Sequence, residues 1–172
     1  MFNTQRGSES FKETDLSEAY LFEASLPEIN CSGSDLSRIH LPYANLSQAN
    51  LCQAQLMDAE MGDIKLYQAK LSQANLQGAN LSRANLRFAD LQEADLTGAN
   101  LQGADLHGAN LNCCNLSNTD LRRANFSKAT LDGAKLVNTN LFRAQDIDLS
   151  TALIDRTTIY PDGYQQGEGE EG

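Results

Sequence analysis

The chain has 172 residues and a mass of 18.8 kDa, a length that suits one domain, and it carries 13 Lys and Arg against 23 Asp and Glu. The formal net charge of −10 excludes binding of duplex nucleic acid or anionic membrane through bulk charge, because phosphate contacts need clustered Lys and Arg. No window approaches 18 uninterrupted apolar residues, so we expect no transmembrane helix and no membrane partner. Residues 1–6 lack the basic-then-apolar order of a signal peptide, so the expected localisation is cytoplasmic.

An uninterrupted repeat with a period of five residues runs from Phe11 to Leu141. It visits 27 positions, of which 23 are Leu, and the exceptions are also apolar. The position three residues after each of these, from Thr14 to Ala144, is Ala in 19 of 27 units. Asn or Asp usually stands between the Ala and the next Leu, and no insertion or deletion breaks the phase.

A period of five fits neither an α-helix nor a β-strand. On a helix, residues five apart are rotated by roughly 140°, so the Leu positions would wind around every side. On a strand, successive Leu side chains would alternate between the two faces. The pattern is satisfied if each five-residue unit forms one short side of a coil, with Leu and Ala inward and the other residues outward. The period alone leaves the number of sides open.

Units such as residues 79–83 (Ala-Asn-Leu-Ser-Arg) and 99–103 (Ala-Asn-Leu-Gln-Gly) resemble the A(D/N)Lxx consensus of the pentapeptide-repeat family. The resemblance covers residues 11–144. It implies an all-β fold, a right-handed quadrilateral β-helix of nearly seven coils with a dry Leu and Ala interior. Residues 157–163 also resemble closing segments of cyanobacterial members of the family.

The two ends of the repeat differ in composition. The sequence predicts a weak cap in residues 1–10, a short C-terminal cap in 145–164 and a disordered acidic tail in 165–172. The phase fails at Asp146, and the apolar residues that follow predict a turn of helix and a strand folded over the last coil. At the other end two interpretations stay open. In the first, the first coil is frayed and Phe11 covers the end of the core. In the second, this end packs on another protomer or on a partner.

The sequence offers no candidate for a catalytic, cofactor-binding or metal site. Cys31 and Cys114 fall inward in the repeat phase, while Cys52 and Cys113 fall outward about three coils apart, roughly 14 Å and too far for a disulfide. No CxxC pair and no motif of a hydrolase, kinase-type phosphate loop or zinc protease is present. We therefore expect no cofactor and no enzymatic activity.

A 20-residue step places aromatic and Arg residues on one side of the predicted coil. These residue types anchor protein interfaces. The alternative interpretation is that the aromatic and Arg residues are distributed over the rod without a function. The candidate interaction face consists of Tyr20, Phe22, Tyr43, Arg83, Arg122, Arg123, Phe142 and Arg143.

Charge is distributed unevenly along the chain. Residues 11–63 carry nine acids against Lys12 and Arg38, residues 64–144 carry nine bases against six acids, and residues 145–172 carry seven acids against Arg156. The family that this chain resembles includes DNA gyrase inhibitors, which mimic duplex DNA with an acidic surface along a rod. Such a mimic needs roughly one negative charge per 1.7 Å of the rod axis. This sequence has no such continuous stripe.

The function predicted is therefore a non-enzymatic scaffold that presents a flat β-helix surface to a protein partner, in a regulatory role like that of family members that modulate cyanobacterial regulators. The alternative is a DNA-mimicking inhibitor of DNA gyrase or another topoisomerase. A third hypothesis is self-association through a coil end, with the acidic N-terminal end against the more basic C-terminal half of another molecule. No direct binding of nucleic acid is expected.

Overall fold

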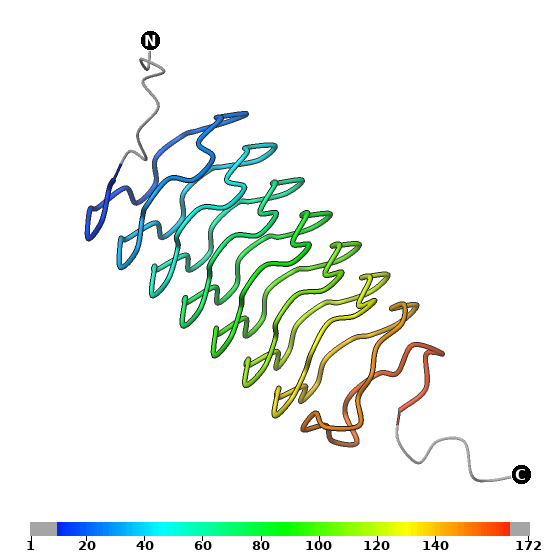
Figure 1. Ribbon diagram of the computed structural model, residues 1–172. Helices are drawn as coiled ribbons and strands as arrows, with labels where there is room; N and C mark the ends of the chain where they lie inside the picture. Colours follow the sequence, from blue (N-terminus) through cyan, green and yellow to red (C-terminus); the bar gives the residue numbers. More distant parts are fainter. Residues whose placement is uncertain (1–9, 166–172) are drawn as a thin grey trace, which may run out of the picture.

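The computed structural model describes residues 10–165 as a rod of stacked coils (Figure 1). Parallel one-residue β-bridges join residues 20 positions apart, from Ser10↔Asn30 to Asn125↔Gln145, so four five-residue sides complete each coil. Within residues 10–165 there is no helix and no strand longer than these bridges, and nothing there could span a membrane as a helix. Most of the weak N-terminal cap (1–9) and of the acidic tail (166–172) predicted from the sequence lies outside the described residues.

Each unit turns because its middle residues form a tight β-turn. The N–H of the Ala position donates to the carbonyl of the Leu three residues earlier, as from Ala79 to Leu76 at 3.1 Å. The residue before that Ala has a positive φ in every unit from Glu13 to Arg143, as a type II turn requires. Most of these residues are not glycine, so the stacked coils hold ordinary side chains in the left-handed region.

The remaining backbone groups explain why Asn or Asp precedes Leu. Neighbouring coils share main-chain hydrogen bonds, for example Leu81 N–H to Asn100 C=O at 2.7 Å and Asn80 N–H to Ala59 C=O at 2.9 Å. The N–H of Ser82, the residue after Leu81, has no such partner in the next coil, and the Asn80 side chain accepts its hydrogen bond at 3.2 Å. The Asn or Asp therefore satisfies the one N–H that the coil stack leaves over.

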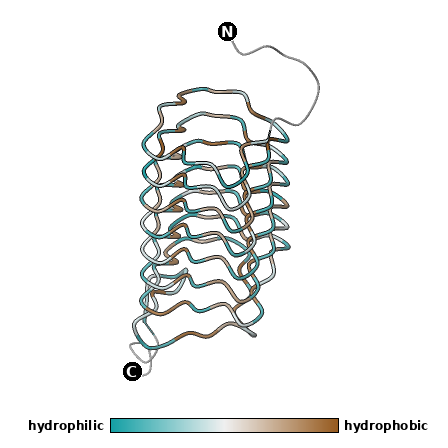
Figure 2. Ribbon diagram, turned by 90° about the vertical axis from the view of Figure 1, so that its left-hand side faces the viewer, coloured by the Kyte–Doolittle hydropathy of each residue, from teal (hydrophilic) through white to brown (hydrophobic). Residues whose placement is uncertain are grey.

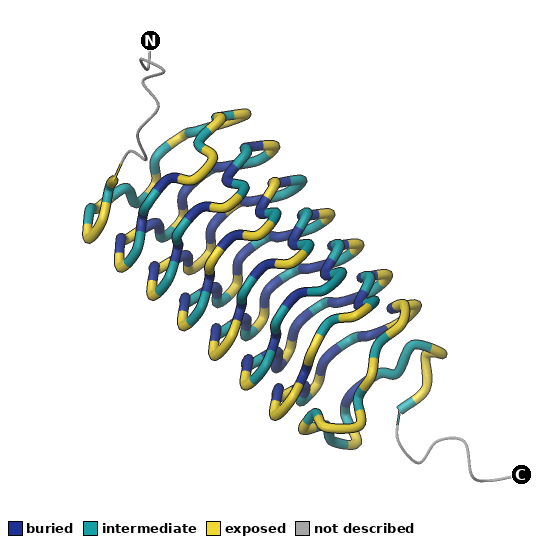
Figure 3. Tube along the Cα trace, viewed as in Figure 1, coloured by how far each residue is buried: buried dark blue, intermediate teal, exposed yellow. Residues whose placement is uncertain are grey.

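The interior of the rod is filled by the Leu and Ala positions, which recur at the same place in successive coils (Figures 2 and 3). Leu91, Leu96 and Leu101 have no exposed surface. At Ser34, Thr119 and Thr139, which replace Ala, the hydroxyl donates to a main-chain carbonyl of the preceding coil 23 residues earlier, as Thr119 Oγ1 does to Leu96 at 2.9 Å. No buried side-chain nitrogen or oxygen between residues 10 and 165 lacks a partner.

Beyond Asp146 the chain continues as an irregular partial coil, residues 146–165, which we call the closing segment. Leu153 pairs with Lys135 and Ile159 with Asn140, so the spacing shortens from 20 residues to 18 and then 19. The predicted turn of helix is wrong, because these residues extend along the last coil and donate to and accept from its free main-chain groups. Gln165, predicted to begin the tail, forms an antiparallel bridge with Ile159.

The N-terminal end is open in the described part of the chain. The inward residues of the first coil, except Ile29, are only half-buried. They surround a cavity of about 330 Å³ whose lining includes Phe11, Leu16, Leu21, Leu26 and Ile29.

Candidate interaction surface

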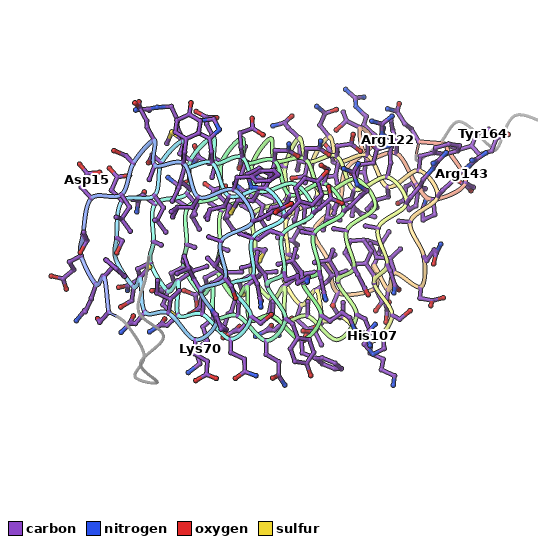
Figure 4. All side chains as sticks on the ribbon, turned by 90° about the horizontal axis from the view of Figure 1, so that it is seen from above. Asp15, Lys70, His107, Arg122, Arg143 and Tyr164 are labelled. Carbon is purple, nitrogen blue, oxygen red and sulfur yellow. The ribbon has the colours of Figure 1, made fainter. Side chains whose placement is uncertain are left out.

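The candidate face comprises the outward residues that flank the inward positions 21, 41, 61, 81, 101, 121 and 141. An unbroken line of bridges runs along this side from Tyr20 through His40, Glu60, Asn80, Asn100 and Asp120 to Asn140. The eight predicted residues lie along that line, yet the structure gathers them into two separate groups, with Arg83 between them. Arg122 and Arg143 lie near one end of the rod, far from Asp15 at the other end (Figure 4).

The N-terminal group is an aromatic cluster of Tyr20, Phe22, His40 and Tyr43. The Tyr20 and His40 rings stack at 4.2 Å with 6° between their planes, because residues 20 apart stand directly over one another in adjacent coils. Phe22 meets Tyr43 edge to face at 5.8 Å. Tyr20 is 79% exposed and Phe22 is 62% exposed. The cluster is therefore a pre-arranged, solvent-facing apolar surface.

Two of these aromatic residues stand where the repeat normally has Asn or Asp. Tyr20 and His40 have no carboxamide or carboxylate oxygen with which to cap the following turn. After His40 the uncapped position is Pro42, which has no N–H to satisfy and whose fixed φ suits the first turn residue. The coil therefore tolerates His40 in place of the usual Asn or Asp, and the imidazole ring of His40 can take part in the aromatic cluster.

Arg83 is already paired within the coil stack. Its Nε and Nη2 donate to the two carboxylate oxygens of Asp63 at 2.8 and 2.6 Å. These hydrogen bonds lower the pKa of Asp63, and the same contact raises the pKa of Arg83. The Arg83 side chain is 65% exposed, so it remains reachable while its charge is compensated.

The C-terminal group is partly occupied by contacts of its own. The Nε and Nη2 of Arg122 donate hydrogen bonds to the carboxylate of Asp120 in the same unit. Burial raises the pKa of Asp120, but these hydrogen bonds hold it below its usual value. The Arg143 guanidinium lies 5.0 Å from the centre of the Phe142 ring. That ring also covers Gly163 of the closing segment, where an added Cβ would lie 3.2 Å from ring carbons. Phe142 therefore helps to hold the closing segment and is less available than predicted.

A second aromatic cluster, on the neighbouring side of the coil, was missed by the sequence reasoning. Tyr67 and Phe88 meet edge to face at 6.0 Å, and Phe88 meets His107 at 5.3 Å. Phe88 is 45% exposed, and its ring lies over Gly108. The ring leaves no room for a Cβ at position 108, because that atom would lie 2.6 Å from the ring carbons. The same 20-residue step that assembled the candidate face would have found these residues.

Reactive groups are few in residues 10–165. All four cysteines are free: Cys31 and Cys114 are buried, Cys52 is half-buried and Cys113 is exposed, as the repeat phase predicts. Burial raises the pKa of the Cys31 thiol to about 11 and that of Cys114 to about 12, which keeps both protonated near neutral pH. No group of three or more His, Cys, Asp or Glu side chains in this part of the chain could hold a metal ion.

A family described as pentapeptide repeats matches the chain in eight copies, at residues 14–38, 34–73, 64–103, 74–112 and 99–138. The chain is a pentapeptide-repeat protein. This confirms the family that residues 79–83 and 99–103 resemble. A comparison with curated proteins finds no significant match.

Solved structures of pentapeptide-repeat proteins are similar to this chain. HetL from the cyanobacterium Nostoc sp. strain PCC 7120, described as involved in regulation of heterocyst differentiation, is 29% identical over 92% of this chain and 94% of its own, with a TM-score of 0.35. Rfr23 from the cyanobacterium Cyanothece 51142 is 25% identical over 85% of this chain and 90% of its own, with a TM-score of 0.46. A trypsin-treated form of QnrB1, a plasmid-mediated fluoroquinolone resistance protein, is 19% identical over 85% of this chain and 77% of its own, with a TM-score of 0.50, a likeness of fold alone.

Proposed function

We propose that this pentapeptide-repeat protein is a non-enzymatic, cytoplasmic scaffold that binds a regulatory protein partner through its candidate face. The proposal takes the coil to be the right-handed quadrilateral β-helix of nearly seven turns that the family resemblance implies. Such a rod is a rigid support, so exposed side chains on one side keep fixed mutual positions.

The observation that carries the proposal is the exposed aromatic cluster of Tyr20, Phe22, His40 and Tyr43. Large rings held at 53–79% exposure cost free energy in water for Tyr20, Phe22 and Tyr43. Their stacked and edge-to-face contacts fix their orientation before binding, which lowers the entropy lost on association. Aromatic residues of this kind are the usual anchors of protein interfaces.

The alternative, inhibition of a topoisomerase by mimicry of duplex DNA, has weaker support. Along the candidate face the carboxylates of Asp63 and Asp120 are compensated by Arg83 and Arg122. Between Asp63 and Asp120 this side carries no further acidic residue. A phosphate-like row would need a carboxylate at every coil. A supercoiling assay with DNA gyrase tests this alternative directly, and inhibition that is lost when the coil acids are neutralised would establish it.

The scaffold proposal is tested by cross-linking and affinity capture from a lysate of the organism that encodes the chain. The test variant is Tyr20→Ser/Phe22→Ser/Tyr43→Ser. The matched control, Met57→Ser/Tyr67→Ser/Phe88→Ser, removes three surface side chains that lie on sides of the rod other than the candidate face. We expect a protein captured by the wild type to be lost with the test variant and retained with the control.

Equal capture by both variants would contradict the assignment of the candidate face. Recovery of gyrase by the wild type, together with inhibition of supercoiling, would replace the scaffold proposal with the alternative. Both variants must first show wild-type unfolding curves, because a misfolded coil would lose any partner.

A further inference from the structure

The open N-terminal end of the rod combines three features that no other part of the described chain shares. The first is the apolar cavity of about 330 Å³ inside the first coils. Phe11, Leu16, Leu21 and Leu26, which line it, are half-buried, whereas the corresponding leucines of the middle coils have essentially no exposed surface. An apolar cavity open to water is a site where hydrophobic side chains of a partner would gain free energy by burial.

The second feature is a ring of carboxylates around the cavity. The tips of all four turns of the first coil are glutamates, Glu13, Glu18, Glu23 and Glu28, and all four are exposed. In the next coils the same four positions hold no complete set of like charges. Two cations lie beside the ring: Lys12 Nζ is 3.4 Å from Glu13, and Arg38 pairs with Glu18 at 2.8 Å. Residues 11–63 nevertheless carry nine acids against only these two bases.

The third feature is the free main-chain edge of the first coil. In the interior, carbonyls such as those of Asp35 and Ser37 accept hydrogen bonds from Leu16 and Glu18 of the preceding coil. Within residues 10–165 no main-chain N–H donates to the equivalent carbonyls of the first coil, which belong to Asp15, Ser17, Tyr20, Phe22, Ser25 and Pro27. Each side of this edge offers two carbonyls for every N–H, so the edge is rich in acceptors.

We propose that the open N-terminal end is a second binding site, which takes a segment of another protein with apolar side chains flanked by Lys or Arg. The apolar side chains enter the cavity, and the cations meet the glutamate ring and the acceptor-rich edge. The glutamates favour a partner with positive charge, and the free main-chain carbonyls favour a partner with hydrogen-bond donors. This site adjoins the candidate face, because Tyr20 and Phe22 contribute carbonyls to its edge, but it does not rest on the function proposed above.

A second copy of the chain fits this end poorly. Two N-terminal ends packed together would oppose eight glutamates and set carbonyl edges against carbonyl edges. The basic half of another copy carries Arg122, Arg123 and Arg143 on the side of a rod, where the backbone of residues 10–165 follows the coils and no segment stands out from them (Figure 1). Contacts between the end of one copy and the side of the next would also not form a closed oligomer, and would build filaments instead.

The proposal is tested with a synthetic peptide that alternates Lys with Leu and carries one central Trp. The chain contains no Trp, so Trp emission reports only on the peptide. One control peptide has Glu in place of Lys, and another has Ser in place of Leu. We expect a blue-shifted emission and saturable binding for the first peptide only, with a dissociation constant at least about tenfold lower than for either control.

Protein variants locate the binding. Glu13→Gln/Glu18→Gln/Glu23→Gln/Glu28→Gln removes the ring, and a matched control, Asp58→Asn/Glu60→Gln/Glu93→Gln/Asp146→Asn, removes four exposed charges elsewhere. The ring variant should weaken binding at least about tenfold and the control less than about twofold. Ala24→Leu, which fills the cavity without changing any charge, should abolish the blue shift. Wild-type unfolding curves for these variants ensure that loss of binding reports on the site.

Five results would overturn the proposal. Absence of saturable binding, or equal weakening by the two four-charge variants, would show that there is no site or only bulk attraction. Persistence of the blue shift in Ala24→Leu would place the peptide elsewhere. A tenfold tighter binding to Phe2→Ser would show that the leading residues of this chain occupy the end, and a sedimentation mass that rises with concentration would indicate a second copy.

Discussion

The two ends of the rod are built from the same repeat, yet they meet solvent differently. At the C-terminal end Leu136 and Leu141 have no exposed surface, and Leu136 N–H and Leu141 N–H donate to Leu153 and Ile159 of the closing segment, both at 2.8 Å. At the N-terminal end Leu16 and Leu21 are half-buried around an open cavity. A solenoid core is therefore complete only where another layer of chain, regular or irregular, lies on it.

The comparison also shows that the closing segment does not need the repeat sequence. It carries Asp146 where a core Leu is expected, and Leu153 is 60% exposed. It still supplies main-chain partners and one fully buried hydroxyl, that of Thr158, which donates to the carbonyl of Leu136. Main-chain hydrogen bonding thus closes this end as much as apolar burial does.

The largest expected effect comes from truncating core leucines at different distances from the open end. Leu91→Ala should lower the free energy of unfolding by about 2–5 kcal/mol, because it leaves a cavity in a filled interior. Leu16→Ala should cost only about 1 kcal/mol, since Leu16 already borders open space. Chemical unfolding of both variants measures the difference. Equal costs would mean that the N-terminal end is as well packed as the middle.

A smaller effect is expected from removing inward hydroxyls at the two ends. Thr158→Val should cost about 1–3 kcal/mol, because within residues 10–165 its hydroxyl is the one donor to the buried carbonyl of Leu136. Ser34→Ala, at the open end, should cost less than about 1 kcal/mol, because the Phe11 carbonyl that Ser34 contacts also accepts from Thr14 N–H at 3.2 Å.

Exposed Thr130→Val serves as the control for this pair and should change stability by less than about 0.5 kcal/mol. The unfolding free energies are compared in the same denaturant. A cost for Ser34→Ala that matches or exceeds that of Thr158→Val would remove the distinction between the ends.

The smallest effect belongs to the Arg83–Asp63 pair, which is remote from both ends. Arg83→Gln should lower the free energy of unfolding by less than about 1 kcal/mol at neutral pH, because the Arg83 side chain is 65% exposed and solvent screens the pair. The folded-state pKa of Asp63 is lowered from 3.8 by hydrogen bonds from Arg83, so this contribution is complete above pH 3.8 and fades as the pH falls through the lowered pKa. Unfolding curves of wild type and variant should therefore differ at neutral pH and converge at a pH below the lowered pKa of Asp63. A difference that grows in acid would contradict this pairing.

The period of five residues was sufficient to predict which side chains point inward, and the family match confirms its origin. The position of a residue within its five-residue unit determines whether its side chain points inward or outward. This is so because each unit forms its own hydrogen-bonded turn, as between Ala79 N–H and Leu76 C=O. The closing segment could not be predicted in the same way, since its register depends on which main-chain groups of the last coil remain free. The Phe88 cluster was overlooked although its spacings of 21 and 19 residues, each close to one coil, are readable in the sequence. The packing of Phe142 on Gly163, by contrast, depends on the irregular register of the closing segment.

The measurement that tests the account most directly is hydrogen exchange of main-chain amides at the two ends of the rod. The amides of Leu16 and Leu21 and those of Leu136 and Leu141 all donate to a neighbouring layer at 2.8 Å, so static hydrogen bonding alone does not distinguish them. We expect the first pair to exchange at least about tenfold faster, because no layer among residues 10–165 covers the first coil and local opening there exposes little additional apolar surface. Equal protection at both ends would contradict the claim that the N-terminal end is open.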